Sequence, residues 1–184
     1  GYRDINNASN REKVEKLWGI KLSDNIFRKD AVNIIDLALN GKLKALYVMG
    51  ENPIINYPVG KDIQAALKRV DFIVVQDTFL TETAQLADVV FPAATFAEKE
   101  GTFTNMGMTV QPLNKAIQPV GDAKPDWQII CELAKKMGHA YSYLSAKGIL
   151  SEIGSITPIY AGINYDRLKR KEFHWVSSFY DKNK

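Results

Sequence analysis

The sequence predicts an α/β fold in which a parallel sheet is flanked by helices. Three short apolar runs, at 45–50, 71–77 and 88–93, have the composition of buried strands. Helical segments separate these runs and the connections are short, which is the pattern of right-handed βαβ units. The residues that follow the three strands should therefore share one edge of the sheet, where α/β proteins usually bind ligands.

The helices are expected where apolar residues recur at helical spacing. Gly41 and Gly138 follow two of these segments directly, as is typical of a helix C-terminus. Thr81 begins another, where its hydroxyl is suited to capping the first turn. The predicted helices span 31–40, 61–70, 81–87 and 126–137.

The chain changes character after the third strand. Residues 95–120 are rich in glycine and threonine and predict a long loop with a short β excursion at 109–114. The charged run 98–100 is typical of a solvated face, and Gly101 of a flexible hinge. We expect 95–120 to be the most mobile internal segment. Two short helices and an aromatic tail at 173–180 follow, so 1–140 is predicted to form one domain and 141–184 an extension.

Composition excludes several classes of function. The 184 residues include 24 basic and 21 acidic side chains, and a net charge of +3 is too balanced to indicate a nucleic-acid partner. No apolar run approaches the ~18 residues of a membrane span, and the first residues lack the core of a signal peptide, so a cytoplasmic protein is expected. The single cysteine, Cys131, excludes an internal disulfide or a Cys₄ metal site in this chain. It is expected to be a structural thiol.

Sequence signatures of catalysis are also missing. The chain has no GxGxxG, GxxxxGK[ST], HExxH or GxSxG motif. His139 and His174 each stand alone and are interpreted as surface or helix-end residues. No catalytic residue and no metal ligand is therefore predicted in this chain.

Polar residues lie where the predicted strands end. Asn52 follows the first strand, where it either completes a tight turn or offers a donor and an acceptor to a ligand. Gln76 and Asp77 end the second strand, and Asp77 either accepts from ribose hydroxyls or helps to start the next helix. Asp126 begins a helix, where a carboxylate is stabilised in any case.

Five motifs surround these residues: YVMGENP at 47–53, QDTFLTETA at 76–84, ADVVFPA at 87–93, AEKEGTFTN at 97–105 and AKPDW at 123–127. In order and spacing, they resemble the cofactor-binding segment of the bis-molybdopterin guanine dinucleotide oxidoreductases. A later stretch, ITPIYAGINYDRL at 156–168, is similar to formate dehydrogenase large (alpha) subunits in particular, and Gly1-Tyr2-Arg3 and Trp18-Gly19 look like the upstream landmarks of these subunits.

The resemblance implies a partial, Rossmann-like domain that holds one guanosine arm of a molybdenum or tungsten cofactor. By motif position, the implied cofactor contacts are Asn52, Gln76, Asp77, Lys99 and Asp126. The parent enzyme would oxidise formate to carbon dioxide, and its [4Fe-4S] cluster and catalytic residues would lie outside this chain. The implied partners are the rest of the large subunit, or a complementary split chain, and an iron–sulfur electron-transfer subunit. Residues 141–184 would lead towards a β-barrel domain, and the chain alone is predicted to be inactive.

One departure from the family leaves a second hypothesis open. Met106-Gly107-Met108 stands where the family usually has an acidic residue and two arginines, which affects how the 95–120 loop would dock. The chain would then be a degenerate or split-gene structural module that binds no cofactor. The five retained contact residues oppose this alternative. An independent nicotinamide-binding protein is opposed by the missing glycine fingerprint.

Overall fold

The computed structural model describes residues 7–23, 31–57, 62–139, 141–157, 160–170 and 173–174. These residues divide into two compact units. The sheet unit comprises the described residues of 27–98 and 117–138, and the hairpin unit comprises those of 1–26, 99–116 and 139–184. Each unit has a hydrophobic cluster of its own.

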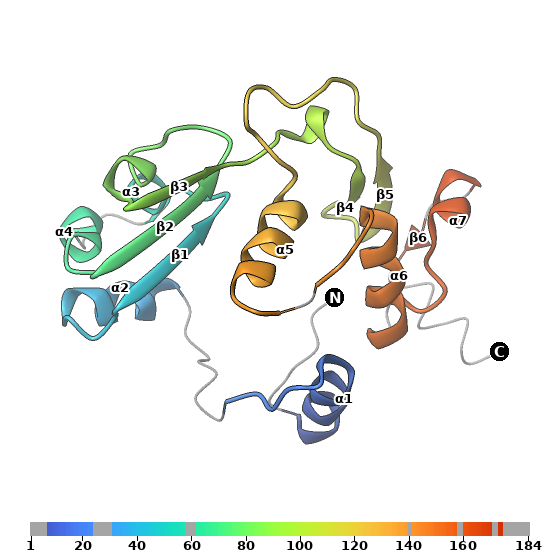
Figure 1. The fold of residues 1–184 in the computed structure, drawn as a ribbon, viewed down its shortest axis with the longest axis horizontal. Coiled ribbons are helices and arrows are strands. Elements are labelled where there is room, and N and C mark those ends of the chain that lie inside the picture. Colours follow the sequence, from blue (N-terminus) through green and yellow to red (C-terminus); the bar gives the residue numbers. More distant parts are fainter. Residues whose placement is uncertain are drawn as a thin grey trace. The chain divides into compact units, whose positions relative to one another are not determined.

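The sheet unit contains a parallel three-stranded sheet in the order β1-β2-β3 (Figure 1). Ala45 pairs with Phe72 at the start of the sheet, and Val74 pairs with Val89. The strands are β1 (Ala45–Met49), β2 (Phe72–Asp77) and β3 (Val89–Pro92). The predicted parallel sheet with flanking helices is therefore confirmed, and the three strand ends share one edge as expected.

The helices of the sheet unit follow the predicted segments, except that the short helix at 53–56 was not predicted and one predicted helix is only a turn. They are α2 (Ala31–Leu39), α3 (Pro53–Asn56), α4 (Ile63–Leu67) and α5 (Asp126–Lys136), with two 3₁₀ turns, η1 (Ala84–Leu86) and η2 (Phe96–Glu98). The helix predicted over 81–87 is only the turn η1. The residue that precedes η1 is Thr83 and not the expected Thr81, although the Thr81 Oγ1 accepts from the Ala84 N–H at 3.1 Å. Asp88 then ends the segment, since its carboxylate accepts from the Ile73 N–H at 2.6 Å and ties the start of β3 to β2.

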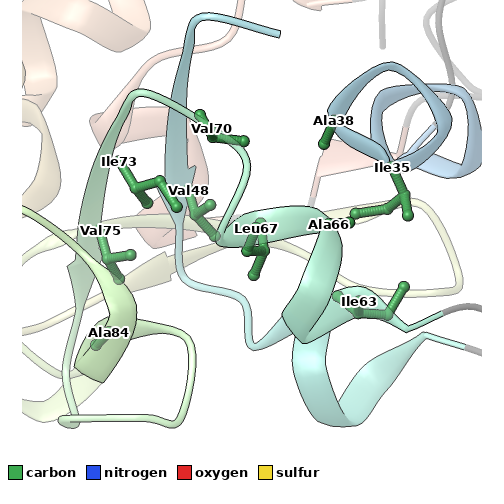
Figure 2. Close-up of a cluster of buried hydrophobic side chains, with 10 residues drawn as sticks. All are labelled: Ile35, Ala38, Val48, Ile63, Ala66, Leu67, Val70, Ile73, Val75 and Ala84. Atoms are coloured by element: carbon green, nitrogen blue, oxygen red, sulfur yellow. The ribbon is translucent and has the colours of Figure 1, made fainter. Parts of the chain in front are cut away.

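Alternation along the strands buries one face of the sheet against helices. Val48, Ile73 and Val75 point into this core, where they meet side chains of α2 and α4 (Figure 2). Leu67 and Val75 are completely buried. Each large apolar side chain buried in this way contributes about 1.5–3 kcal/mol to stability. The ten core residues are Ile35, Ala38, Val48, Ile63, Ala66, Leu67, Val70, Ile73, Val75 and Ala84.

Two glycines with left-handed backbone shape this unit. Gly41 ends α2 with φ +64°, and the next N–H, of Lys42, donates to the Leu37 carbonyl at 2.8 Å. Gly50 ends β1 with the same φ, and its N–H donates to the Gln76 carbonyl at 2.9 Å. Gly50 therefore turns the chain out of the sheet while keeping it bonded to β2.

The hairpin unit is built on an antiparallel pair, β4 (Gly101–Thr104) and β5 (Thr109–Leu113), to which the short β6 (Phe173–His174) adds. The predicted β excursion at 109–114 corresponds to β5. The prediction of a loop around it was wrong for 101–104, because β4 pairs with β5 although its glycine and threonines gave no strand signal. Met106-Gly107-Met108 forms the turn between them, with Met108 at φ +60°.

Helices complete the hairpin unit. They are α1 (Ala8–Trp18), α6 (Ala146–Ile156) and α7 (Tyr165–Arg170). The core of this unit contains Val110, Leu150, Ile163 and Leu168. The two helices predicted after residue 141 correspond to α6 and α7, whereas most of the predicted aromatic tail lies outside the described residues. The predicted boundary at 140 stays a prediction. None of the helices in the described part of the chain has the length and apolar character that a membrane span requires.

Candidate functional site

Asn52 joins the segment after β1 to the segment after β2. Its side-chain oxygen accepts from the Thr83 hydroxyl at 2.7 Å and from the Thr83 N–H at 3.3 Å. Its Nδ2 donates to the Glu82 carboxylate at 2.7 Å. The bond from Asn52 is the main reason why the pKa of Glu82 lies below its usual value. Asn52 is therefore more than a turn residue, because both ends of its amide hold the neighbouring segment.

Gln76 lies at the centre of a chain of three polar side chains. It is fully buried, although it stands on β2 among apolar residues. Its Oε1 accepts from the Tyr47 hydroxyl at 2.5 Å, and its Nε2 donates to the Asp126 carboxylate at 2.7 Å. The sheet and the first residue of α5 are linked in this way, across 50 residues of sequence.

The surroundings of Tyr47 disfavour the ionised form of its phenol. Burial raises the pKa of Tyr47, and the negative charge of Asp126 raises it further. A protonated hydroxyl is what the chain requires, because Tyr47 must donate to Gln76.

Asp77 ends β2 at the shared edge of the sheet. One carboxylate oxygen accepts from the Phe79 N–H at 3.1 Å, which folds the next residues into a local turn. Phe79 and Leu80 are left 73% and 68% exposed by this turn. Asp77 does not start a helix, because the next helical turn, η1, begins only at Ala84 and is preceded by Thr83.

Glu98 corrects the expectation of a solvated charged run. Its side chain is 5% exposed, and its carboxylate accepts from the Thr95 N–H at 2.8 Å and the Val120 N–H at 3.1 Å. Glu98 therefore joins two stretches of the sheet unit. The next residue, Lys99, belongs to the hairpin unit and is half-buried. Its expected contact with the cofactor stays a prediction.

A cavity of about 340 Å³ lies between β3 and α5 in the same unit. Phe91, Ile129 and Leu133 give it apolar walls, and Lys124 and Glu132 form an ion pair of 2.7 Å at its rim. None of the five predicted site residues lines this cavity. The polar strand ends, and not this apolar hollow, hold the groups that suit a polar ligand.

Of the predicted residues, Gln76 and Asp126 are joined directly by a hydrogen bond. Asn52 lies just after β1, and Asp77 is the last residue of the adjacent strand β2, at the same edge of the sheet. Sequence reasoning did not single out Tyr47 or Thr83. A tyrosine within an otherwise apolar strand is a usable signal for Tyr47, because its hydroxyl needs a partner when it is buried. The bond between Thr83 and Asn52 has no comparable signal.

Comparison with known proteins gives one family. The model of the family described as "Molybdopterin oxidoreductase" matches residues 1–136. The F420-dependent formate dehydrogenase subunit alpha of Methanocaldococcus jannaschii is 53% identical over 135 residues, which cover 72% of this chain and 20% of that protein. The F420-dependent formate dehydrogenase 1 subunit alpha of Methanococcus maripaludis is 40% identical over 179 residues, which cover 95% of this chain and 26% of that protein. The chain thus spans about a fifth to a quarter of the length of these relatives.

A solved structure has the same fold. Acetylene hydratase from Pelobacter acetylenicus matches with a TM-score of 0.65 at 23% identity, over 90% of this chain and 24% of that one. At this identity the likeness concerns the fold alone.

Proposed function

The chain belongs to the molybdopterin oxidoreductase family, and from this premise we propose that it holds one guanosine arm of a bis-molybdopterin guanine dinucleotide cofactor in a formate dehydrogenase. The observation that carries the proposal is the hydrogen bond from Gln76 to Asp126. It brings the acidic start of α5 to the sheet, near the edge where Asp77 ends β2.

The chemistry of these side chains fits a guanosine. The base offers N1–H and N2–H₂ as donors, and the ribose offers two hydroxyls. A carboxylate offers only acceptors. Asp77 and Asp126 would therefore receive hydrogen bonds from the base or the ribose. Asn52 and Gln76 hold the segments around them, and Lys99 would supply a positive charge for the pyrophosphate or a pterin carbonyl.

The relatives support the choice of reaction. Two relatives at 40% and 53% identity are named as formate dehydrogenase alpha subunits. When bound, the cofactor supplies a molybdenum or tungsten centre that takes two electrons as formate loses a proton and becomes carbon dioxide. This chain contributes binding and orientation of that group. Its proposed partners are the rest of a large subunit, in one or more chains, and an iron–sulfur subunit that carries the electrons away.

The proposal is tested by the substitution Asp77→Asn. It keeps the size of the side chain, and the remaining carbonyl oxygen still accepts from the Phe79 N–H. One acceptor becomes a donor, however, and would face the donors of guanosine. A charge-assisted hydrogen bond contributes roughly 1.5–3 kcal/mol, so the affinity for guanosine diphosphate should fall at least about tenfold in calorimetry.

The matched control is Asp71→Asn. Asp71 precedes β2 at its opposite end and forms an exposed ion pair with Lys44, at 2.9 Å. The same substitution there should leave the affinity unchanged. Equal affinity of wild type and Asp77→Asn would make Asp77 a turn residue only. No measurable binding by the wild type would favour the structural module without cofactor.

A further inference from the structure

We propose that Tyr47 and Gln76 are positioning residues that hold the Asp126 carboxylate in place for the guanosine, and that the buried Gln76 does not itself touch the ligand. The inference deepens the proposed function and rests on it. It changes the role expected for Gln76 from a contact with the cofactor to a role through Asp126. It also gives a role to Tyr47, the first residue of the 47–53 motif, which was not among the five expected contacts.

Burial excludes Gln76 as a direct contact. The side chain has no exposed surface, and both ends of its amide are engaged within the chain. Asp126, in contrast, is only half-buried. Of these two residues, Asp126 is the one that a ligand would reach.

Chemistry determines the direction of both hydrogen bonds that link Tyr47, Gln76 and Asp126. A carboxylate only accepts, so Gln76 must turn its Nε2 towards Asp126. The Oε1 of Gln76 then faces Tyr47, which must donate its hydroxyl proton. Reversing the amide would set two acceptors against each other at Asp126. The two hydrogen bonds therefore have one arrangement, in which the Gln76 amide holds one oxygen of the Asp126 carboxylate.

The backbone before Asp126 is anchored independently to the end of β3. The Ala94 N–H donates to the Lys124 carbonyl at 2.8 Å, and the Lys124 N–H donates to the Pro92 carbonyl at 3.1 Å. Strand β3 thus holds the main chain that leads into α5, and strand β2 holds the side chain at its start. A carboxylate ordered in this way loses little conformational freedom when a ligand binds, which favours affinity.

The test measures binding of guanosine diphosphate to the 184-residue chain by calorimetry. Asp126→Ala removes the proposed acceptor and should lose at least about tenfold in affinity. Gln76→Leu keeps the volume but removes both bonds, and should lose about tenfold. Tyr47→Phe removes only the outer donor and should lose about threefold, since Gln76 still reaches Asp126. Tyr47 is 39% exposed, so this last variant should fold in any case.

The matched control is Tyr143→Phe in the hairpin unit. The Tyr143 hydroxyl donates to the Glu152 carboxylate within the hairpin unit, and Tyr47 and Gln76 belong to the sheet unit. Its removal should leave the affinity for the nucleotide unchanged. Thermal unfolding of every variant separates loss of binding from loss of fold.

A second measurement distinguishes positioning from simple packing. In the ¹⁵N spectrum, the carboxamide signal of Gln76 should shift when guanosine diphosphate is added, because the partner of that amide gains a ligand. A Gln76 that only fills the core would give no nucleotide-dependent shift. If the wild type binds guanosine diphosphate and the affinities of Gln76→Leu and Tyr47→Phe are both within about twofold of it, the positioning role is overturned. The proposed function would still stand in that case. Absence of wild-type binding would overturn the proposed function, and the positioning role with it.

Discussion

Two amide side chains, Asn52 and Gln76, determine how the segments after the strands are held. Each uses its oxygen and its nitrogen towards different partners, so each joins two parts of the chain at once. An amide is the only neutral side-chain group that offers an acceptor and two donors in one plane. Replacing either residue by aspartate or glutamate would therefore lose one of its two connections.

The pKa of Glu82 provides a test at the residue scale. The hydrogen bond from Asn52 is the largest cause of its lowered pKa, ahead of a backbone hydrogen bond. Asn52→Ala should therefore raise the pKa of Glu82 towards the usual 4.5, as measured by a carboxyl ¹³C titration. Because the pKa of Glu82 is lowered in the folded state, its ionised carboxylate stabilises the fold at neutral pH. This contribution is lost as the pH falls through the folded-state pKa of Glu82.

The control for this titration is Asn40→Ala. Asn40 is exposed, and its side chain donates to the Asp36 carbonyl at the end of α2. The pKa of Glu82 should not respond to this change. A pKa that is equal in wild type and Asn52→Ala would show that the hydrogen bond at 2.7 Å does not act on Glu82.

At the residue scale, the sequence predicts where the polar side chains lie, but it does not predict which residues they bond to. The sequence placed Asn52, Gln76 and Asp77 at strand ends, because strands can be recognised from local apolar runs. The partners of these residues are separated by 31 residues for Asn52 and Thr83 and by 50 for Gln76 and Asp126. No local pattern encodes contacts across such distances. Glu98 was misinterpreted for the same reason, since Val120 lies 22 residues away.

At the scale of elements, two of the left-handed glycines of the sheet unit, Gly41 and Gly50, allow a matched comparison. Gly41 and Gly50 both have φ +64°, and a Cβ at either position would meet nothing within 4 Å. Alanine at either position therefore adds backbone strain without a clash, and should cost roughly 1–2 kcal/mol in urea unfolding. Only Gly50→Ala should also weaken binding of guanosine diphosphate, because Gly50 leads from β1 to Asn52. Unchanged stability of both variants would contradict the strain argument.

Elements with a strong pattern were predictable, and those stabilised by tertiary contacts were not. The strands were recognisable as short apolar runs, and the helices α2 and α5 have helical periodicity and a glycine just past their ends. Strand β4 has no such pattern and depends on its pairing with β5, in which Thr102 faces Pro112. The segment 81–87 has the composition of a helix but not the length, because Asp88 is drawn to the Ile73 amide. Pairing with a distant segment overrides local propensity in both cases.

At the scale of the whole molecule, the chain covers 20% and 26% of its two methanogen relatives. Its one cysteine, Cys131, is half-buried on α5. We expect the 184-residue chain to oxidise no formate when it is supplied with cofactor and an artificial electron acceptor. The rate should equal that of a control without protein, while the full-length alpha subunit of Methanococcus maripaludis, assembled with its partners, serves as the positive control. Turnover above the blank would refute the assignment of this chain to binding alone.

The hydrogen bond from Gln76 to Asp126 also has a consequence for the order of folding. Ala45 pairs with Phe72 and Val74 with Val89, separations of 27 and 15 residues, whereas this bond joins residues 50 apart. The entropy lost on closing a loop grows with its length, so the sheet should nucleate first and α5 should dock afterwards. Asp126→Ala should then accelerate unfolding and leave the refolding rate unchanged in stopped-flow measurements. A slower refolding rate would place α5 in the folding nucleus. During synthesis, the three strands would be complete before Asp126 leaves the ribosome, and Asp126 would be the last of the proposed contact residues to join the fold.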